Sequence, residues 1–159
     1  MKITWNELAV DLTGYTSEDL LSEWRWLVPD NFLLRMVSTL GDAFLEDSDG
    51  KIYWLDVGSA ELQCIAKDTD DFFQLRQQPD NANEWFAPQL IGDLLSSGAV
   101  LQVGQCFSYN IPPTLNGKFS LENLQPRDLT AHFRAHGKIQ RQVKSLPIGT
   151  EIKAVELER

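Results

Sequence analysis

The chain has 159 residues, of which 43% are apolar and 23% are charged, and its formal net charge at neutral pH is −9. A chain of this length and composition is typical of a single globular domain that buries its own core. No apolar run approaches the roughly 18 residues that a membrane-spanning helix needs, and the first ten residues lack the apolar stretch of a signal peptide. We therefore expect a cytoplasmic protein without a membrane partner.

Charge is distributed unevenly along the chain. Residues 1–100 hold 18 acidic and 6 basic side chains, whereas residues 101–159 hold 5 acidic and 8 basic ones. The acidic part repels phosphate backbones, which argues against nucleic-acid binding, and it would attract a basic protein. The alternative is a solvated acidic surface that only promotes solubility. The two cysteines, Cys64 and Cys106, are too few for a disulfide scaffold or a zinc knuckle, and we expect both to be buried thiols.

Two helices are predicted near the N-terminus. Thr4 and Glu7 have the spacing of a capping box and predict the start of a short helix. A longer helix is predicted over 16–29, because a hydroxyl residue precedes an apolar stripe that ends at Pro29. Trp26 lies off this stripe, so it is either covered by another element or a residue that contacts a partner.

Three short strands are predicted next, over Ala43–Glu46, Lys51–Asp56 and Glu61–Lys67. The Asp49-Gly50 pair between the first two strands is a strong hairpin signal, since glycine adopts positive φ without steric cost. The first two strands are therefore predicted to pair antiparallel.

The acidic residues of this hairpin raise the question of a calcium loop. Counted from Asp47, positions 5, 6 and 12 are Lys51, Ile52 and Gly58, where an EF-hand needs an oxygen ligand, a glycine and a glutamate. The pattern fails at all three places. We therefore expect an ordinary turn, with Asp47 and Asp49 at an exposed tip and no bound metal.

The rest of the chain mixes helices and short strands. Thr69 is predicted to cap a short helix that runs through Phe72, Phe73 and Leu75. A second helix is predicted over 84–97, followed by a strand over 105–111 and a last helical stretch over 138–146. Because the elements do not alternate as regular βαβ units, they indicate an α+β fold with a mainly antiparallel sheet and helices packed against it. We expect a single domain over residues 1–159.

Apolar and polar residues alternate from 128 to 135, which predicts a further strand. Its inward face holds Leu129, Ala131 and Phe133, while His132 and Arg134 face the other way. On a strand, His132 and His136 lie roughly 13 Å apart, too far for a shared zinc ion. The sequence also lacks a nucleophile elbow, a catalytic-cysteine motif and a glycine-rich phosphate loop. We therefore predict no catalytic residue, no metal and no cofactor, and an enzyme is the least favoured function.

Several spaced motifs of the sequence together match the pattern of one protein family. The front half contributes Trp24-x-Trp26-Leu27, Leu40-Gly41-Asp42-x-Phe44-Leu45, Asp49-Gly50 and Leu55-Asp56. The back half contributes Gly104-Gln105-Cys106-Phe107-Ser108-Tyr109, Pro112-Pro113-x-Leu115-x-Gly117, Glu122-Asn123, His132, Gly137-x-Ile139-x-x-Gln142-Val143 and Leu146-Pro147-x-Gly149-Thr150. Over about residues 15–152 the chain resembles the C-terminal domain of the Tdi-type immunity proteins, which neutralise DNase effectors of type VI secretion. That family is similar in turn to the SUKH class of immunity domains. Relatives often have glycine where this chain has Asn116, and we expect the turn to survive because asparagine tolerates left-handed backbone.

The resemblance implies a SUKH-like α+β domain that acts by binding a toxin, without catalysis. A nuclease toxin is commonly basic around its phosphate site, which would give the acidic part of this chain a purpose. The leading hypothesis is therefore a cytoplasmic immunity protein that binds a basic nuclease toxin. The alternative is an interaction or regulatory module of the same fold with a different protein partner. The candidate partner-binding residues are Glu46, Asp47, Asp49, Asp68, Asp70 and Asp71, with Trp26 or Trp85 as the anchors of a more apolar contact.

Overall fold

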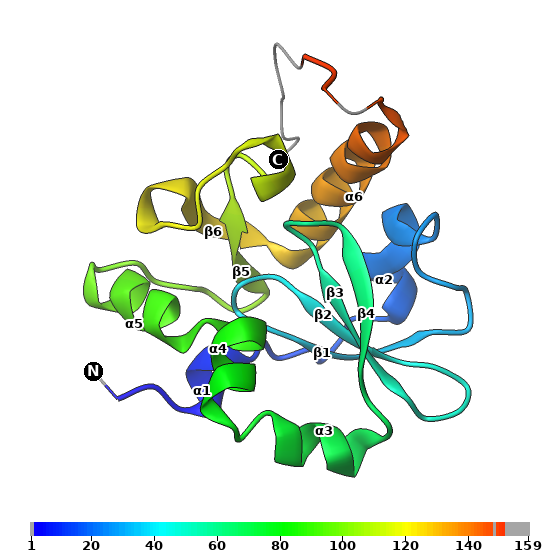
Figure 1. Ribbon diagram of the computed structural model, residues 1–159. Coiled ribbons are helices and arrows are strands. Elements are labelled where there is room, and N and C mark those ends of the chain that lie inside the picture. Colours follow the sequence, from blue (N-terminus) through cyan, green and yellow to red (C-terminus); the bar gives the residue numbers. More distant parts are fainter. Residues whose placement is uncertain (1, 148, 152–159) are drawn as a thin grey trace.

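Two antiparallel sheets organise the chain, and the computed structural model describes residues 2–147 and 149–151 (Figure 1). The larger sheet has the strand order β1-β2-β3-β4, and the smaller one pairs β5 with β6. The strands are β1 (Leu33–Val37), β2 (Ala43–Glu46), β3 (Ile52–Asp56), β4 (Glu61–Ala66), β5 (Gln105–Tyr109) and β6 (Leu124–Asp128). The predicted α+β class with mainly antiparallel sheets is confirmed. The predicted domain limits include residues 1, 148 and 152–159, which lie outside the described part.

Among the described residues, two α-helices precede the larger sheet in the chain, three follow it, and the long helix α6 comes after the smaller sheet. The α-helices are α1 (Trp5–Leu8), α2 (Ser17–Leu21), α3 (Thr69–Leu75), α4 (Pro79–Phe86), α5 (Pro88–Ser96) and α6 (Leu129–Ser145). The short 3-10 turns of the described residues are η1 (Ser22–Trp24), η2 (Pro113–Leu115) and η3 (Leu121–Asn123). Within the described residues, no helix has the length and apolar character needed to cross a membrane.

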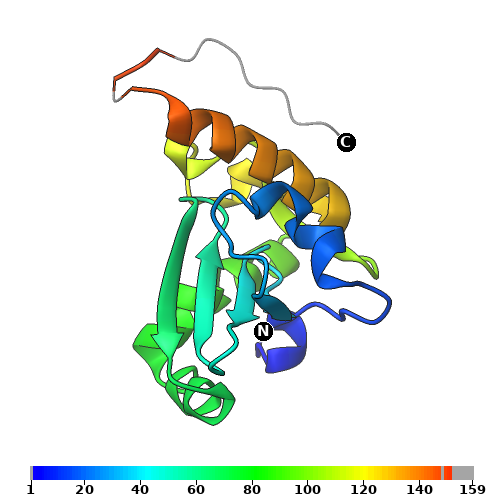
Figure 2. The same ribbon diagram turned by 90° about the vertical axis from the view of Figure 1, so that its right-hand side faces the viewer.

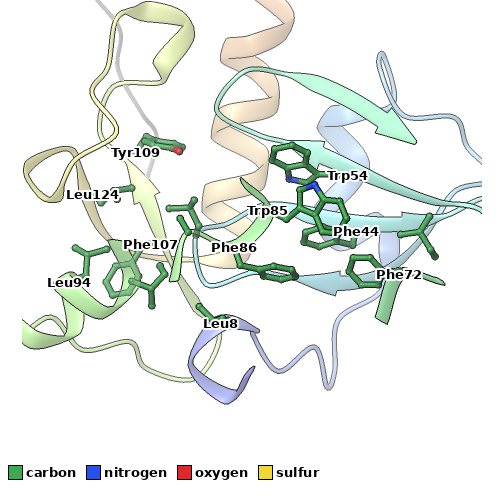
Figure 3. Packing of buried hydrophobic residues seen from close by; sticks show 14 of the residues in the cluster. Leu8, Phe44, Trp54, Phe72, Trp85, Phe86, Leu94, Phe107, Tyr109 and Leu124 are labelled. Atoms are coloured by element: carbon green, nitrogen blue, oxygen red, sulfur yellow. The ribbon is translucent and has the colours of Figure 1, made fainter. Parts of the chain in front are cut away.

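The central strands β2 and β3 of the larger sheet are buried on both faces, because helices lie on each side of the sheet (Figure 1 and Figure 2). On β2, Phe44 points toward α3 and α4, and its ring centroid lies 5.2 Å from that of Phe72 and 5.0 Å from that of Phe86 (Figure 3). The next residue, Leu45, belongs to the second core cluster, together with Phe133 of α6. Successive side chains of a strand point to opposite faces, so β2 contributes to both cores.

The segment from 128 to 135 is not a strand, and that prediction was wrong. From Leu129 onward it forms the first half of α6, and its buried residues recur at the spacing of three and four that is typical of a helix. The inward residues of α6 include Leu129, His132, Phe133, His136 and Gln140. Phe133 is fully buried as expected, but His132 lies inside with it, while Ala131 is only half-buried.

Two predicted helices were also too long. The helix expected over 16–29 ends at Leu21 and tightens into η1, because Trp24 turns into the core and its Nε1 donates to the carbonyl of Phe133 at 2.8 Å. The helix expected over 84–97 is instead two helices, separated at Ala87, whose φ is +47°. Pro88 then begins α5, since proline suits the first position of a helix but not its interior.

The predicted hairpin is confirmed, with its strands within one residue of the expected bounds. Gly50 has the expected positive φ, +85°, and its N–H donates to the carbonyl of Asp47 at 3.1 Å. The turn at Asn116 also survives, with φ +67°. Of the two cysteines, Cys106 is buried as expected, whereas Cys64 is exposed on β4.

Candidate functional site

The register of the larger sheet brings two acidic segments of the chain to the same end of the sheet. Glu46 of β2 pairs with Ile52 of β3, which pairs with Ala66 of β4. Neighbouring strands lie about 4.8 Å apart, so the turn after Glu46 and the start of α3 leave the sheet at one end (Figure 1). We call this surface the acidic edge, and its members are Glu46, Asp47, Asp49, Asp68, Asp70 and Asp71.

Several of these acids also hold the local backbone. Asp47 Oδ1 accepts from the N–H groups of Asp49 and Lys51, both at 2.9 Å, and so stabilises the turn. Asp68 Oδ1 accepts from the N–H of Asp71 at 2.7 Å and caps α3, so the cap predicted at Thr69 was wrong by one residue. Asp47 is half-buried rather than fully exposed at the tip, because these bonds draw its carboxylate onto the turn. A change at either position must therefore keep the hydrogen-bond acceptor.

The acidic edge keeps a surplus of negative charge. Glu46 is paired with Arg35, and Lys51 and Lys67 are exposed at the same end of the sheet. Three cations therefore accompany six carboxylates. Exposed charges of this kind attract a basic partner over a distance and are screened by salt.

The two candidate tryptophans differ in what they offer to a partner. Trp85 is 5% exposed and lies in the core with its ring 5.9 Å from that of Phe72, so it cannot anchor a contact without leaving its place (Figure 3). Trp26 is half-buried, stacks on Trp24 at 5.8 Å, and donates from Nε1 to the carbonyl of Glu23 at 2.9 Å. Of the two candidates, only Trp26 is partly exposed.

A buried polar cluster, which sequence reasoning missed, joins α6 to β5 and to the turn before β2. His132 Nε2 lies 2.8 Å from the carbonyl oxygen of Gly41, and its Nδ1 lies 2.7 Å from Ser108 Oγ. Because a carbonyl only accepts, Nε2 carries the proton and Nδ1 accepts from the Ser108 hydroxyl. The hydroxyl has then used its proton, so His136 Nε2 donates to Ser108 Oγ at 3.2 Å. The signal in the sequence was the spacing of four between the histidines, which a helix would place on one face.

Burial keeps both imidazoles uncharged. Desolvation lowers the pKa of His132 to about 4. It also lowers the pKa of His136 well below the ordinary value, and His132 and the Arg127 guanidinium add to this effect. Since both folded pKa values lie below the unfolded one, the imidazoles' contribution to stability is complete above about pH 6.5 and is lost as the pH falls toward 4.

Ser108 and His132 have the spacing of a nucleophile and its base, but a substrate cannot reach them. A serine hydroxyl that donates to an imidazole is the arrangement by which serine is activated in acyl transfer. Ser108, His132 and His136 are each fully buried, so a substrate has no approach to the hydroxyl. The cluster therefore orders the interior and fixes where α6 lies against β5.

Asp42 is a second buried polar group, and it joins β2 to β3. Its carboxylate accepts from the N–H of Val57 at 3.0 Å and from Trp54 Nε1 at 3.2 Å. Burial, and secondarily the nearby Asp56 carboxylate, raise the pKa of Asp42 well above its usual range. It offers no exposed charge to a partner.

The histidines lie far closer together than the 13 Å expected of a strand, with ring centroids 4.8 Å apart. Both nitrogens of His132 are nonetheless engaged, one by Gly41 and one by Ser108. Across residues 2–147 and 149–151, no three His, Cys, Asp or Glu side chains gather as metal ligands would.

Many of the motif residues that carry the family resemblance lie inside the protein. Gly41, Ser108, Asn123, His132 and Gly137 are all buried. At Gly137 a methyl group would lie 2.7 Å from a backbone oxygen of the preceding η1 segment, so glycine lets α6 approach closely. These motifs therefore specify the packing of the fold, whereas the acidic edge lies on the surface.

Comparisons with known proteins bear on the resemblance. Residues 66–140 match the model of the family described as "T6SS immunity protein Tdi1, C-terminal". Among solved structures, Atu4351 from Agrobacterium tumefaciens is similar at 16% sequence identity with a TM-score of 0.49, over 77% of this chain and 61% of that one. The chain thus spans about three fifths of that protein. A search of curated proteins found no match. The predicted resemblance is confirmed over residues 66–140, and this part of the chain carries the pattern of the Tdi1 C-terminal family.

Proposed function

We propose that this protein is a non-catalytic immunity protein that binds and neutralises a basic nuclease toxin of type VI secretion. The match of residues 66–140 to the Tdi1 C-terminal family carries the proposal. The matched part begins at the end of β4 and includes α3, so it contains Asp68, Asp70 and Asp71 of the acidic edge. The hairpin that completes the edge precedes the matched part.

Charge supports a basic partner. A nuclease must hold a phosphate backbone and therefore presents cationic side chains around its site. The net charge of −9 and the acidic edge are complementary to such a surface. Complementary exposed charges mainly raise the association rate and fix the orientation of docking, while packed contacts set the lifetime of the complex. A protein acting in this way must meet the toxin in the cytoplasm, where the DNA is.

A growth assay tests the proposal. The chain is co-expressed with the product of the gene beside its own, which we expect to be the nuclease effector, and we expect growth to be restored. The matched control is a distantly related nuclease effector, which the chain should not neutralise. Arrest that persists with the neighbouring toxin, at equal expression of a folded protein, would contradict the proposal.

The mode of action requires a second readout. If neutralisation is by binding, the toxin released from the complex by denaturant and refolded should be unmodified in mass and active again. A toxin recovered with a changed mass or a cleaved chain would show that the protein acts as an enzyme instead.

A further inference from the structure

An open, mainly apolar pocket of about 620 Å³ lies between the N-terminal segment and the loop that follows α5. Its walls include Val10, Leu95, Leu101 and, at the inner end, the fully buried Phe107. The volume is within the range of roughly 300–1,000 Å³ that ligand pockets show. We call it the α1–α5 pocket, since those two helices are neighbours on this side of the molecule (Figure 1).

The rim of the α1–α5 pocket exposes apolar side chains that the fold does not cover. Val103 is 97% exposed and Val100 is 70% exposed, and both line the pocket. The loop that carries them is held by several backbone bonds, among them Gln105 N–H to the carbonyl of Gln102 at 3.1 Å and Leu129 N–H to that of Gly104 at 2.9 Å. The valines are therefore presented in a fixed arrangement, which reduces the entropy lost when a partner binds.

Charge on the rim of the α1–α5 pocket selects the kind of occupant. Glu7 and Asp11 stand at the pocket, and the lining within the described residues includes no Lys, Arg or His. Hydrogen bonds from Thr4 and from Thr13 lower the pKa values of Glu7 and Asp11, respectively, so both carboxylates are charged at neutral pH. A second copy of this chain would bring the same carboxylates and a net charge of −9, and a fatty acid would bring another carboxylate.

We infer that the α1–α5 pocket binds apolar side chains carried on a basic segment of the protein partner. The apolar floor and the two valines bury the partner's aliphatic or aromatic residues, while Glu7 and Asp11 attract the Lys or Arg residues beside them. Apolar anchors of this kind carry most of the affinity at interfaces, whereas rim charges contribute orientation and rate. The inference rests on the proposed function in naming the toxin as that partner, and the acidic edge then acts as a separate steering surface.

Random twelve-residue peptides displayed on phage provide a probe that does not depend on the toxin's identity. Peptides selected on the wild-type protein should combine Leu, Ile, Phe or Trp with neighbouring Lys or Arg and should lack Asp and Glu. In the Val100→Asn/Val103→Asn variant the Kd of a selected peptide should rise about tenfold or more, because two apolar side chains are lost from the contact. Ile111→Asn is the matched control, because Ile111 is another exposed apolar residue but does not line the pocket, and it should leave Kd unchanged.

The rim charges have their own test. Glu7→Gln/Asp11→Asn keeps the hydrogen-bond acceptors and should weaken peptide binding about two- to fivefold at low salt and little at high salt. Peptides without a cationic bias, no enriched peptide at all, or a Kd indifferent to the valine substitutions would overturn the inference. A dimer that the valine substitutions dissociate would assign the pocket to a second copy and overturn it too.

These results separate the pocket from the proposed function. If the wild-type chain and the valine variant rescue growth equally and bind the peptide equally, the inference about the pocket is wrong and the immunity function stands. If selected peptides bind as expected but the wild-type chain does not rescue growth, the pocket stands with a different basic protein as partner.

Discussion

Replacing Ser108 by alanine tests the buried polar cluster with almost no change in packing, because only one oxygen is removed. The hydroxyl serves His132 Nδ1 at 2.7 Å, His136 Nε2 at 3.2 Å and Arg127 Nη1 at 3.2 Å. Both imidazoles are fully buried and would each lose a partner, at about 1–3 kcal/mol per unsatisfied group. Arg127 is half-buried and also bonds the carbonyl of Tyr109 at 3.5 Å, so its loss is smaller. Ser108→Ala should therefore lower the free energy of unfolding by about 2–6 kcal/mol.

Urea denaturation followed by tryptophan fluorescence measures this loss, since the chain has five tryptophans. Ser96→Ala, at an exposed serine that ends α5, is the control and should change stability by about 0.5 kcal/mol or less. A loss for Ser108→Ala no greater than that of the control would show that the hydroxyl does not satisfy the imidazoles, and the tautomers assigned here would be wrong.

Three further predictions concern the core, the histidines and the acidic edge. Phe133→Ala should lower the free energy of unfolding by about 3–5 kcal/mol, because the ring is fully buried against the larger sheet; an unchanged thermal midpoint would place the ring outside the core. The chain's two histidines are His132 and His136, and with the pKa of His132 lowered to about 4 their imidazole NMR signals should not shift between pH 8 and 6, whereas a midpoint near 6.5 in the folded protein would refute their burial. Changing Asp47, Asp49, Asp70 and Asp71 to Asn should slow association with the toxin strongly at low salt and weakly at high salt; a rate indifferent to both would remove the acidic edge from the mechanism.

Local signals in the sequence were sufficient for the hairpin and for the cap of α1. The Asp49-Gly50 pair sets the turn between β2 and β3, and the Thr4 side chain accepts from the N-terminal turn of α1 as its spacing with Glu7 predicts. Each of these depends on residues within four positions of one another. The mixture of elements without βαβ alternation was likewise enough for the fold class.

The errors arose where distant residues decide the structure. In α6, apolar Leu129, Ala131 and Phe133 alternate as in a strand, and the helical stripe becomes visible only when His132 and His136 are counted as interior. Their burial depends on Gly41 and Ser108, which lie 91 and 24 residues from His132. The periodicity of apolar residues along the sequence could not by itself reveal these partners.

The candidate site follows the same division. The acids of the hairpin and of α3 could be named from the sequence, but only the strand register shows that they leave the sheet at one end. Trp85 was named as an anchor because aromatic residues are common at interface centres. The packing of α4 against Phe72 buries it instead, and a contact made between two helices leaves no trace in the order of residues.

Direct inhibition of the nuclease tests the central claim, that the protein neutralises its toxin by binding it. The neighbouring effector is purified, and its cleavage of plasmid DNA is measured while the protein is added from zero to several equivalents. Binding predicts that cleavage falls linearly and stops near one equivalent, with the inhibited toxin eluting in a complex with the protein. Cleavage that continues at several equivalents of folded protein, with the two proteins eluting apart, would contradict the account.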